Sequence, residues 1–131
     1  MKKIHIAGGG IAGMSAAIYL SKKSVPVTIF EKRSNIGQSR HGDYEGLENW
    51  IFDETTPLFF KNIGFDFSKI NLYPISEFKV HCENKSSLLV RSKKPFFSLV
   101  KRGPLGGDFD NQLYQQCKES GVKFRFNVNA S

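Results

Sequence analysis

The first thirty residues change their pattern of apolar and polar positions twice, and each change predicts a new element. Apolar side chains dominate residues 3–7 and 26–30, two runs of the length of short buried β-strands. Three consecutive glycines follow the first run and open a predicted helix over residues 11–22. The chain turns again from Ser24, a common turn residue. The pattern therefore predicts a strand, a helix and a second strand.

The middle of the chain predicts a long loop followed by a short helix. Residues 31–53 are rich in glycine and charge, which is typical of a long loop kept for function. A helix is predicted over about 55–62, with Asp53 or Thr55 as its cap and Gly64 at its end.

The second half of the chain predicts more strands and one further helix. Apolar runs are separated by the polar segment 83–87, which reads as a hairpin turn. The expected elements are strands over 78–82, 88–91 and 96–100, a helix from Asp108 or Asp110 to about residue 120, and a strand over 122–128.

Together these elements predict an α/β fold. A Rossmann-like βαβ unit would bind FAD or NAD(P), and an antiparallel β meander would be inserted into it. We expect residues 1–76 with 104–131 to form the dinucleotide-binding domain, and residues 77–103 to begin a substrate-side domain. The length of 131 residues suits one domain.

Composition narrows the class of protein. The chain is 40% hydrophobic and 24% charged, and no segment approaches the ~20 apolar residues of a membrane-spanning helix. Lys2 and Lys3 precede an apolar run as in a secretory signal, but the adjacent glycines interrupt that run. Cys82 and Cys117 lack the spacing of metal ligands and are expected to be reduced. We therefore predict a cytoplasmic protein without a metal site.

The chain is basic, with a net charge of +7. Its lysines and arginines are spread along the sequence in short pairs, and they accompany no nucleic-acid-binding motif. We therefore predict no nucleic-acid partner. An anionic ligand remains a possible use of the charge, and so does peripheral association with an anionic membrane surface.

The glycine turn at residues 8–13 has the chemistry of a phosphate site. Gly8 permits a tight turn, Gly10 lets a diphosphate approach the backbone, and Gly13 allows the helix to pack closely on the strand. The amides near Ile11 and Ala12 begin the helix, so they lack intrahelical partners and attract an anion. The alternative is a glycine-rich turn with no ligand.

Glu31 ends the second predicted strand, 18 residues after Gly13. An acid at this place hydrogen-bonds ribose hydroxyls and repels a 2′-phosphate, which favours FAD or NAD over NADP. The adjacent Lys32 and Arg33 would soften this preference. A surface carboxylate without a ligand is the alternative for Glu31.

The motif Gly8-x-Gly10-x-x-Gly13-x-x-x-Ala17, followed by Val27 and Glu31, resembles the N-terminal fingerprint of flavoproteins with two dinucleotide-binding domains. In those proteins the first βαβ unit binds the ADP half of FAD. The resemblance therefore implies FAD as the cofactor, with NAD as the less favoured choice.

Two further segments resemble the geranylgeranyl reductase and aromatic hydroxylase branch of that family. The first is Glu31-Lys32-Arg33 with Ile36-Gly37 and Arg40, and the second is Val100-Lys101-Arg102 with Phe109-Asp110-x-x-Leu113. The resemblance implies that Lys32, Arg40 and Arg102 lie near the cofactor. Members of this branch are several times longer, so we expect an incomplete flavoprotein fold, with a C-terminal portion or a partner chain supplying the rest.

The predicted function is the FAD-binding N-terminal portion of an oxidoreductase that reduces or hydroxylates an apolar, isoprenoid-like small molecule. By itself the 131-residue chain is not expected to be catalytically competent. The alternative is a non-catalytic module that binds an adenine dinucleotide. The flavin would carry the redox step, so no catalytic residue is assigned. His41 lies in the loop expected near the cofactor, where a solvated histidine is the simpler interpretation.

Overall fold

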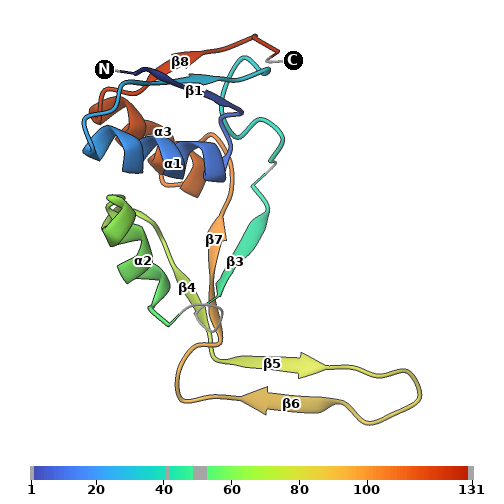
Figure 1. The fold of residues 1–131 in the computed structure, drawn as a ribbon. Helices are drawn as coiled ribbons and strands as arrows, with labels where there is room; N and C mark the ends of the chain where they lie inside the picture. The colour runs from blue at the N-terminus through green and yellow to red at the C-terminus, as the bar shows by residue number, and fades with distance from the viewer. Residues whose placement is uncertain (1, 41, 49–52, 130–131) are drawn as a thin grey trace.

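The fold combines one parallel sheet with two antiparallel ones (Figure 1). The structure is a computed structural model that describes residues 2–40, 42–48 and 53–129. Its elements are β1 (Ile4–Ala7), α1 (Ile11–Lys22), β2 (Val27–Phe30), β3 (Tyr44–Glu48), α2 (Thr56–Ile63), the 3₁₀ helix η1 (Phe67–Lys69), β4 (Tyr73–Ile75), β5 (Glu77–Val80), β6 (Leu88–Arg91), β7 (Phe97–Lys101), α3 (Phe109–Glu119) and β8 (Lys123–Arg125).

The parallel sheet has the strand order β1-β2-β8, and α1 and α3 lie side by side on one of its faces (Figure 1). Ile4 pairs with Val27 and Ile29 pairs with Phe124, so the apolar strands predicted from the sequence are neighbours. The fold class predicted from the sequence is confirmed. The helix predicted over 11–22 also has these bounds in the structure.

The two helices pack closely because small residues face the sheet and apolar residues face each other. A Cβ at Gly13 would lie 2.2 Å from the backbone oxygen of Gly8, so only glycine fits there. Met14 and Ile18 from α1, with Leu113 and Cys117 from α3, have no exposed surface. These four residues form the centre of the hydrophobic core.

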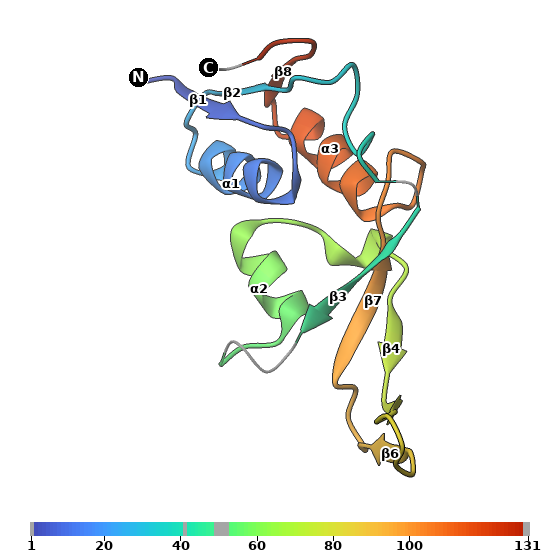
Figure 2. The same ribbon diagram turned by 90° about the vertical axis from the view of Figure 1, so that its right-hand side faces the viewer.

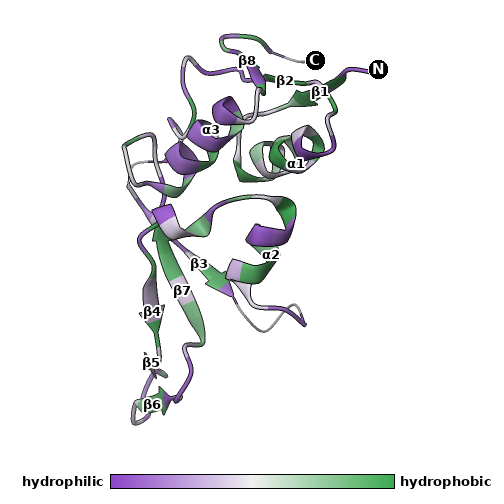
Figure 3. Ribbon diagram, turned by 90° about the vertical axis from the view of Figure 1, so that its left-hand side faces the viewer, coloured by the Kyte–Doolittle hydropathy of each residue, from purple (hydrophilic) through white to green (hydrophobic). Residues whose placement is uncertain are grey.

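The second sheet has the order β3-β7-β4 and is entirely antiparallel. Figure 2 shows α2 on one side of it, below the parallel sheet. Hydrophobic positions continue along β7, as the green colour in Figure 3 indicates. Val100 of this strand is fully buried and joins the same core as α1 and α3. The two sheets therefore share one hydrophobic core.

Two sequence predictions need correction here. Residues 31–53 were expected to form a loop, but β3 lies inside this range and pairs with β7 from Tyr44↔Lys101 to Glu48↔Phe97. The strand predicted at 96–100 also does not continue a meander with its predecessors. It joins β3 and β4, whereas β5 and β6 form a separate hairpin. The sequence prediction failed because β7 pairs with β3 and β4, which lie far from it in the sequence.

The β5–β6 hairpin projects from the far end of the molecule (Figure 1). Its strands pair from Glu77↔Arg91 to Val80↔Leu88, with the predicted turn between them. All of its residues except Val90 are exposed. The domain division, which starts a substrate-side domain at residue 77, stays a prediction. Among the helices of the described residues, none has the length and hydropathy needed to cross a membrane.

Candidate dinucleotide site

The glycine turn leaves an open approach to the first amides of α1. Gly8 has φ +98°, a left-handed conformation that favours glycine, and its N–H donates to the Phe30 carbonyl oxygen at 2.8 Å. Gly10 is the N-cap of α1, and among the described residues no side chain caps the helix. A Cβ at Gly10 would meet no heavy atom within 4 Å. The start of the helix therefore offers backbone donors to open space, as a phosphate site requires.

Glu31 lies at the other side of this turn and points toward it. Its Oε2 accepts a hydrogen bond from the backbone N–H of Gly9 at 2.8 Å, and its Oε1 accepts one from Arg33 at 2.9 Å. An ionised carboxylate has about four acceptor positions. Each oxygen therefore keeps an acceptor position for a hydroxyl of a bound ribose.

A single cavity of about 750 Å³ runs along the glycine turn and the loop after β2. Its volume lies in the range of small-molecule and cofactor sites. It brings together every residue that the sequence predicts to contact the cofactor. These residues are Gly8, Gly10, Ile11, Ala12, Gly13, Glu31, Lys32, Arg40 and Arg102.

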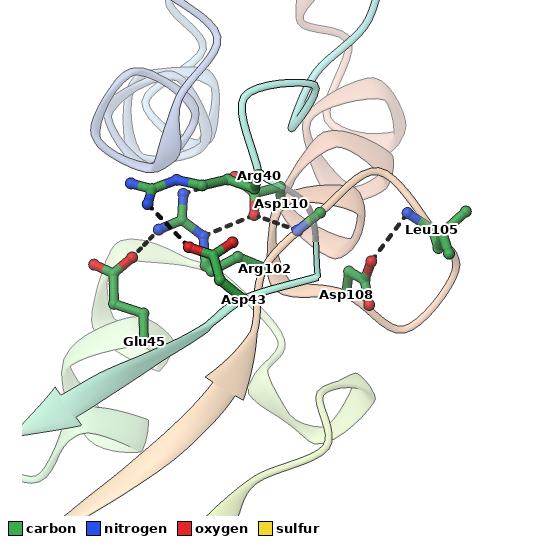
Figure 4. A network of polar contacts seen from close by, with 8 residues as sticks. Arg40, Asp43, Glu45, Arg102, Leu105, Asp108 and Asp110 are labelled. Carbon is green, nitrogen blue, oxygen red and sulfur yellow. Dashed lines mark hydrogen bonds and ion pairs between the residues drawn. The ribbon is translucent and has the colours of Figure 1, made fainter.

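Arg102 reaches this cavity from the end of β7 and is bound by two carboxylates (Figure 4). Its Nε and Nη2 donate to the two oxygens of Asp110 at 2.7 and 2.8 Å, an arrangement that fixes the guanidinium plane. Its Nη1 donates to Glu45 Oε2. Only 5% of Arg102 is exposed, so it is a buried residue of the cavity wall and not a surface arginine.

Burial by itself would lower the pKa of Arg102, but the hydrogen bonds and charges of Asp110 and Glu45 raise it above its usual value. The guanidinium is therefore a permanent positive charge at the cavity wall. Arg40 lies nearby in the same view, and its Nη1 is 3.2 Å from Asp43 Oδ2 (Figure 4). This end of the cavity thus contains two cations, each already paired.

Backbone contacts bring the two cofactor-facing loops together. The Arg102 N–H donates to the Asp43 carbonyl oxygen at 2.8 Å and so joins the two loops, while the Gly103 N–H donates to the Asp110 side chain of α3 at 3.0 Å. A Cβ on Gly37 would lie 2.8 Å from the Gly103 carbonyl carbon, so these loops touch through their backbones. The loop after β2 is therefore fixed against the loop after β7.

Sequence reasoning missed Glu45 and Asp110 as members of the site. Asp110 is only 2% exposed although it is an acid in the first turn of α3. An acid between apolar residues that are predicted to be buried indicates an ion pair, and Asp110 in Phe109-Asp110-x-x-Leu113 is such an acid. Glu45 gave no such signal. His41 lies outside the described residues, and in the described part of the chain no three His, Cys, Asp or Glu side chains gather as metal ligands.

The family comparison supports the βαβ assignment. Residues 6–64 match the family model described as an NAD(P)-binding Rossmann-like domain. Among curated proteins, thiamine thiazole synthase of Thermococcus kodakarensis is 28% identical over 100 residues, which are 75% of this chain and 39% of that protein. A 1-hydroxycarotenoid 3,4-desaturase of a Flavobacterium species is 49% identical over 41 residues, or 31% of this chain and 8% of that protein.

Solved structures show the same fold over nearly the whole chain. A variant of 2-methyl-3-hydroxypyridine-5-carboxylic acid oxygenase matches with a TM-score of 0.72 and 20% identity, covering 97% of this chain and 32% of its own. A geranylgeranyl bacteriochlorophyll reductase-like protein from Thermoplasma acidophilum gives 0.65 and 23%, covering 95% and 30%. CtdE, solved with FAD and a substrate, gives 0.66 and 20%, covering 98% and 31%.

The chain therefore spans about a third of the length of these structures and less than half of the curated relatives. The predicted resemblance to reductases and hydroxylases is confirmed for the fold, and CtdE, which shares this fold, was solved with FAD. Residues 6–64 match a Rossmann-like NAD(P)-binding unit, and nearly the whole chain has a fold that occurs as about a third of these oxygenase and reductase-like structures.

Proposed function

We propose that this chain is the FAD-binding N-terminal portion of an oxidoreductase whose substrate is an apolar, isoprenoid-like small molecule. One observation carries the proposal. All nine residues predicted to contact the cofactor, which come from four separate segments of the sequence, line one cavity. The open glycine turn and the acid that faces it fit the diphosphate and ribose of an adenine dinucleotide.

Each part of the chain would have a separate task in holding FAD. The first amides of α1, at Ile11 and Ala12, would bind the diphosphate, and Glu31 would accept hydrogen bonds from the ribose. Lys32 and Arg40 would add positive charge beside the phosphates. When bound, FAD supplies the redox chemistry by accepting and donating a hydride. The described residues would bind and orient it.

An apolar substrate is supported by a second cavity of about 500 Å³. Leu47, Phe67 and Leu72 line it, and Leu47 lies two residues beyond Glu45 on the same face of β3. The names of relatives agree with this, since they include a carotenoid desaturase and a geranylgeranyl reductase-like protein. We leave reduction and hydroxylation open as alternative reactions of this site.

The test is a titration of the chain with FAD. The backbone of Gly10 is extended, so any residue can adopt it, and a valine side chain would fill only the open space above the turn. Gly10→Val should lower FAD affinity at least about tenfold, because the diphosphate can no longer approach the amides. Gly106→Val is the matched control, since Gly106 also has open space around it and does not line the cavity. Unchanged FAD binding by Gly10→Val would refute the proposal.

The second candidate function is a non-catalytic module that binds an adenine dinucleotide. It is favoured by the lining of the described cavity, which contains the features that bind the ADP end of a dinucleotide. ADP, NAD and FAD would then bind with equal affinity. A marked gain for FAD would show that the flavin end is also held. Cytoplasmic location, association with a membrane surface and a further portion or partner chain stay predictions.

A further inference from the structure

We propose that the Glu45 carboxylate and the diphosphate of a bound dinucleotide compete for the same cation, the Arg102 guanidinium. In this proposal, which rests on the proposed function, the diphosphate replaces Glu45 on Nη1 of Arg102. Asp110 keeps the rest of the guanidinium in place during the exchange. Glu45 therefore sets the affinity of the site by occupying it when no ligand is bound.

Asp110 is suited to be the permanent partner of Arg102. It is 2% exposed, forms two parallel hydrogen bonds with the guanidinium and also accepts from the Gly103 N–H. Removing such a buried partner would leave a charge uncompensated, which is strongly unfavourable. Ligand binding therefore cannot easily separate Arg102 from Asp110.

Glu45 has the opposite properties and is suited to be replaced. Its side chain is 45% exposed, and it contacts Arg102 through Nη1 alone. Glu45 and Arg102 both line the dinucleotide cavity, so their ion pair borders the space that a ligand would occupy. Figure 4 shows Glu45 and Asp110 approaching the guanidinium from different sides. One side can thus be exchanged while the other is retained.

The charges around Arg102 favour an exchange, while Lys32 and Arg33 add positive charge elsewhere in the lining of the cavity. Arg40 and Arg102 face three carboxylates, those of Asp43, Glu45 and Asp110. A diphosphate added to this set would meet a net negative group, and like charges repel most strongly where burial limits screening. Movement of Glu45 into solvent removes one negative charge and frees one donor. Both changes, the lost negative charge and the freed N–H donor, favour binding of the diphosphate.

The experiment compares ligand affinities of the wild-type chain and Glu45→Gln. The amide keeps the size of the side chain but loses its charge, so it competes poorly for Arg102. We expect FAD and ADP to bind Glu45→Gln about fivefold more tightly, the upper value for a half-exposed ion pair. Adenosine, which has no phosphate, should bind both proteins equally. Calorimetry measures FAD and ADP, and NMR titration measures the weaker adenosine.

Glu48→Gln is the matched control, because Glu48 lies on the same strand and does not line the cavity. It removes the same charge from the molecule and should leave all three affinities unchanged. Thermal unfolding of each variant verifies that it is folded.

Three results would overturn the proposal: no gain in Glu45→Gln, an equal gain in Glu48→Gln, or a gain for adenosine as large as for ADP. Each leaves the proposed function intact, provided that the wild-type chain binds FAD. Failure of both the wild type and Glu45→Gln to bind FAD would instead refute the proposed function, and this inference with it.

Discussion

The parallel βαβ region and the β5–β6 hairpin both contain runs of apolar residues, but they bury them very differently. In the first region, α1 and α3 cover the sheet, and Met14, Ile18 and Leu113 have no exposed surface. In the hairpin, Phe78 and Leu88 remain 39% and 63% exposed. An isolated hairpin is marginally stable at best in water, so the two regions should contribute unequally to stability. Apolar composition alone does not reveal which strands form a core.

The comparison is tested most strongly by removing one leucine from each region. Leu113→Ala should lower the free energy of unfolding by about 3 kcal/mol, because it leaves a cavity between α1 and α3. Leu88→Ala should change it by less than about 0.5 kcal/mol, since this side chain is largely exposed. Urea denaturation followed by circular dichroism measures both. Equal losses would show that the hairpin is part of the cooperative core.

A second prediction concerns the closest packing in the βαβ region. Gly13→Ala should destabilise the protein by about 2 kcal/mol, because the new methyl group would overlap the Gly8 carbonyl oxygen. Gly10→Ala places its methyl group in open space, so its effect should be within about 0.5 kcal/mol. Thermal unfolding compares the two. A stable Gly13→Ala variant would contradict the packing described for the start of α1.

How much of this region the sequence predicts depends on how local its determinants are. The glycine turn and α1 follow from a continuous motif whose residues act on their immediate neighbours, and Glu31 follows from its spacing of 18 residues after Gly13. β3 was missed because Tyr44–Glu48 contains glycine and two acids, and its pairing with β7 is not visible locally. β4 was missed because it is three residues long and contains Pro74, which is typical of an edge strand.

The site residues also differ in whether local sequence patterns reveal them. The residues of the turn were found by their spacing, and Arg102 by its motif. Its partner Glu45 is 57 positions away, and only the register of β3 against β7 brings the two together. A register of this kind depends on tertiary packing, which single-sequence patterns do not contain.

Cysteine chemistry distinguishes the two regions without any substitution. Burial raises the pKa of Cys117 from 9.0 to about 12, and Cys82, just past the end of β5, is exposed. An alkylating reagent at pH 8 should therefore label Cys82 at once and Cys117 only after unfolding. Mass spectrometry of the labelled peptides measures this. Rapid labelling of both would show that α3 opens readily.

The same thiol predicts a dependence of stability on pH. Because the folded state holds the proton more tightly than the unfolded state, the contribution of Cys117 is complete below pH 9. It is lost as the pH rises from about 9 toward about 12. Cys117→Ser lacks this titration, so the stability difference between the two proteins should change with pH over that window. A constant difference would contradict the raised pKa.

The smallest expected effect lies in the hairpin. Glu77 and Arg91 form an ion pair of 2.5 Å between side chains that are 53% and 68% exposed. Glu77→Gln should change stability by less than about 0.5 kcal/mol, because solvent and salt screen such pairs. Chemical denaturation in low and high salt measures it. A larger, salt-sensitive loss would show that the hairpin is held by charge.

The bond between the Gly9 N–H and Glu31 has a consequence for how a ligand would associate. The carboxylate connects the ends of β1 and β2 in the absence of a ligand, so the glycine turn already has the conformation that binds one. Little chain entropy then remains to be lost on complex formation. The association rate constant of the ligand should therefore be set by diffusional encounter and not by slow folding of the loop.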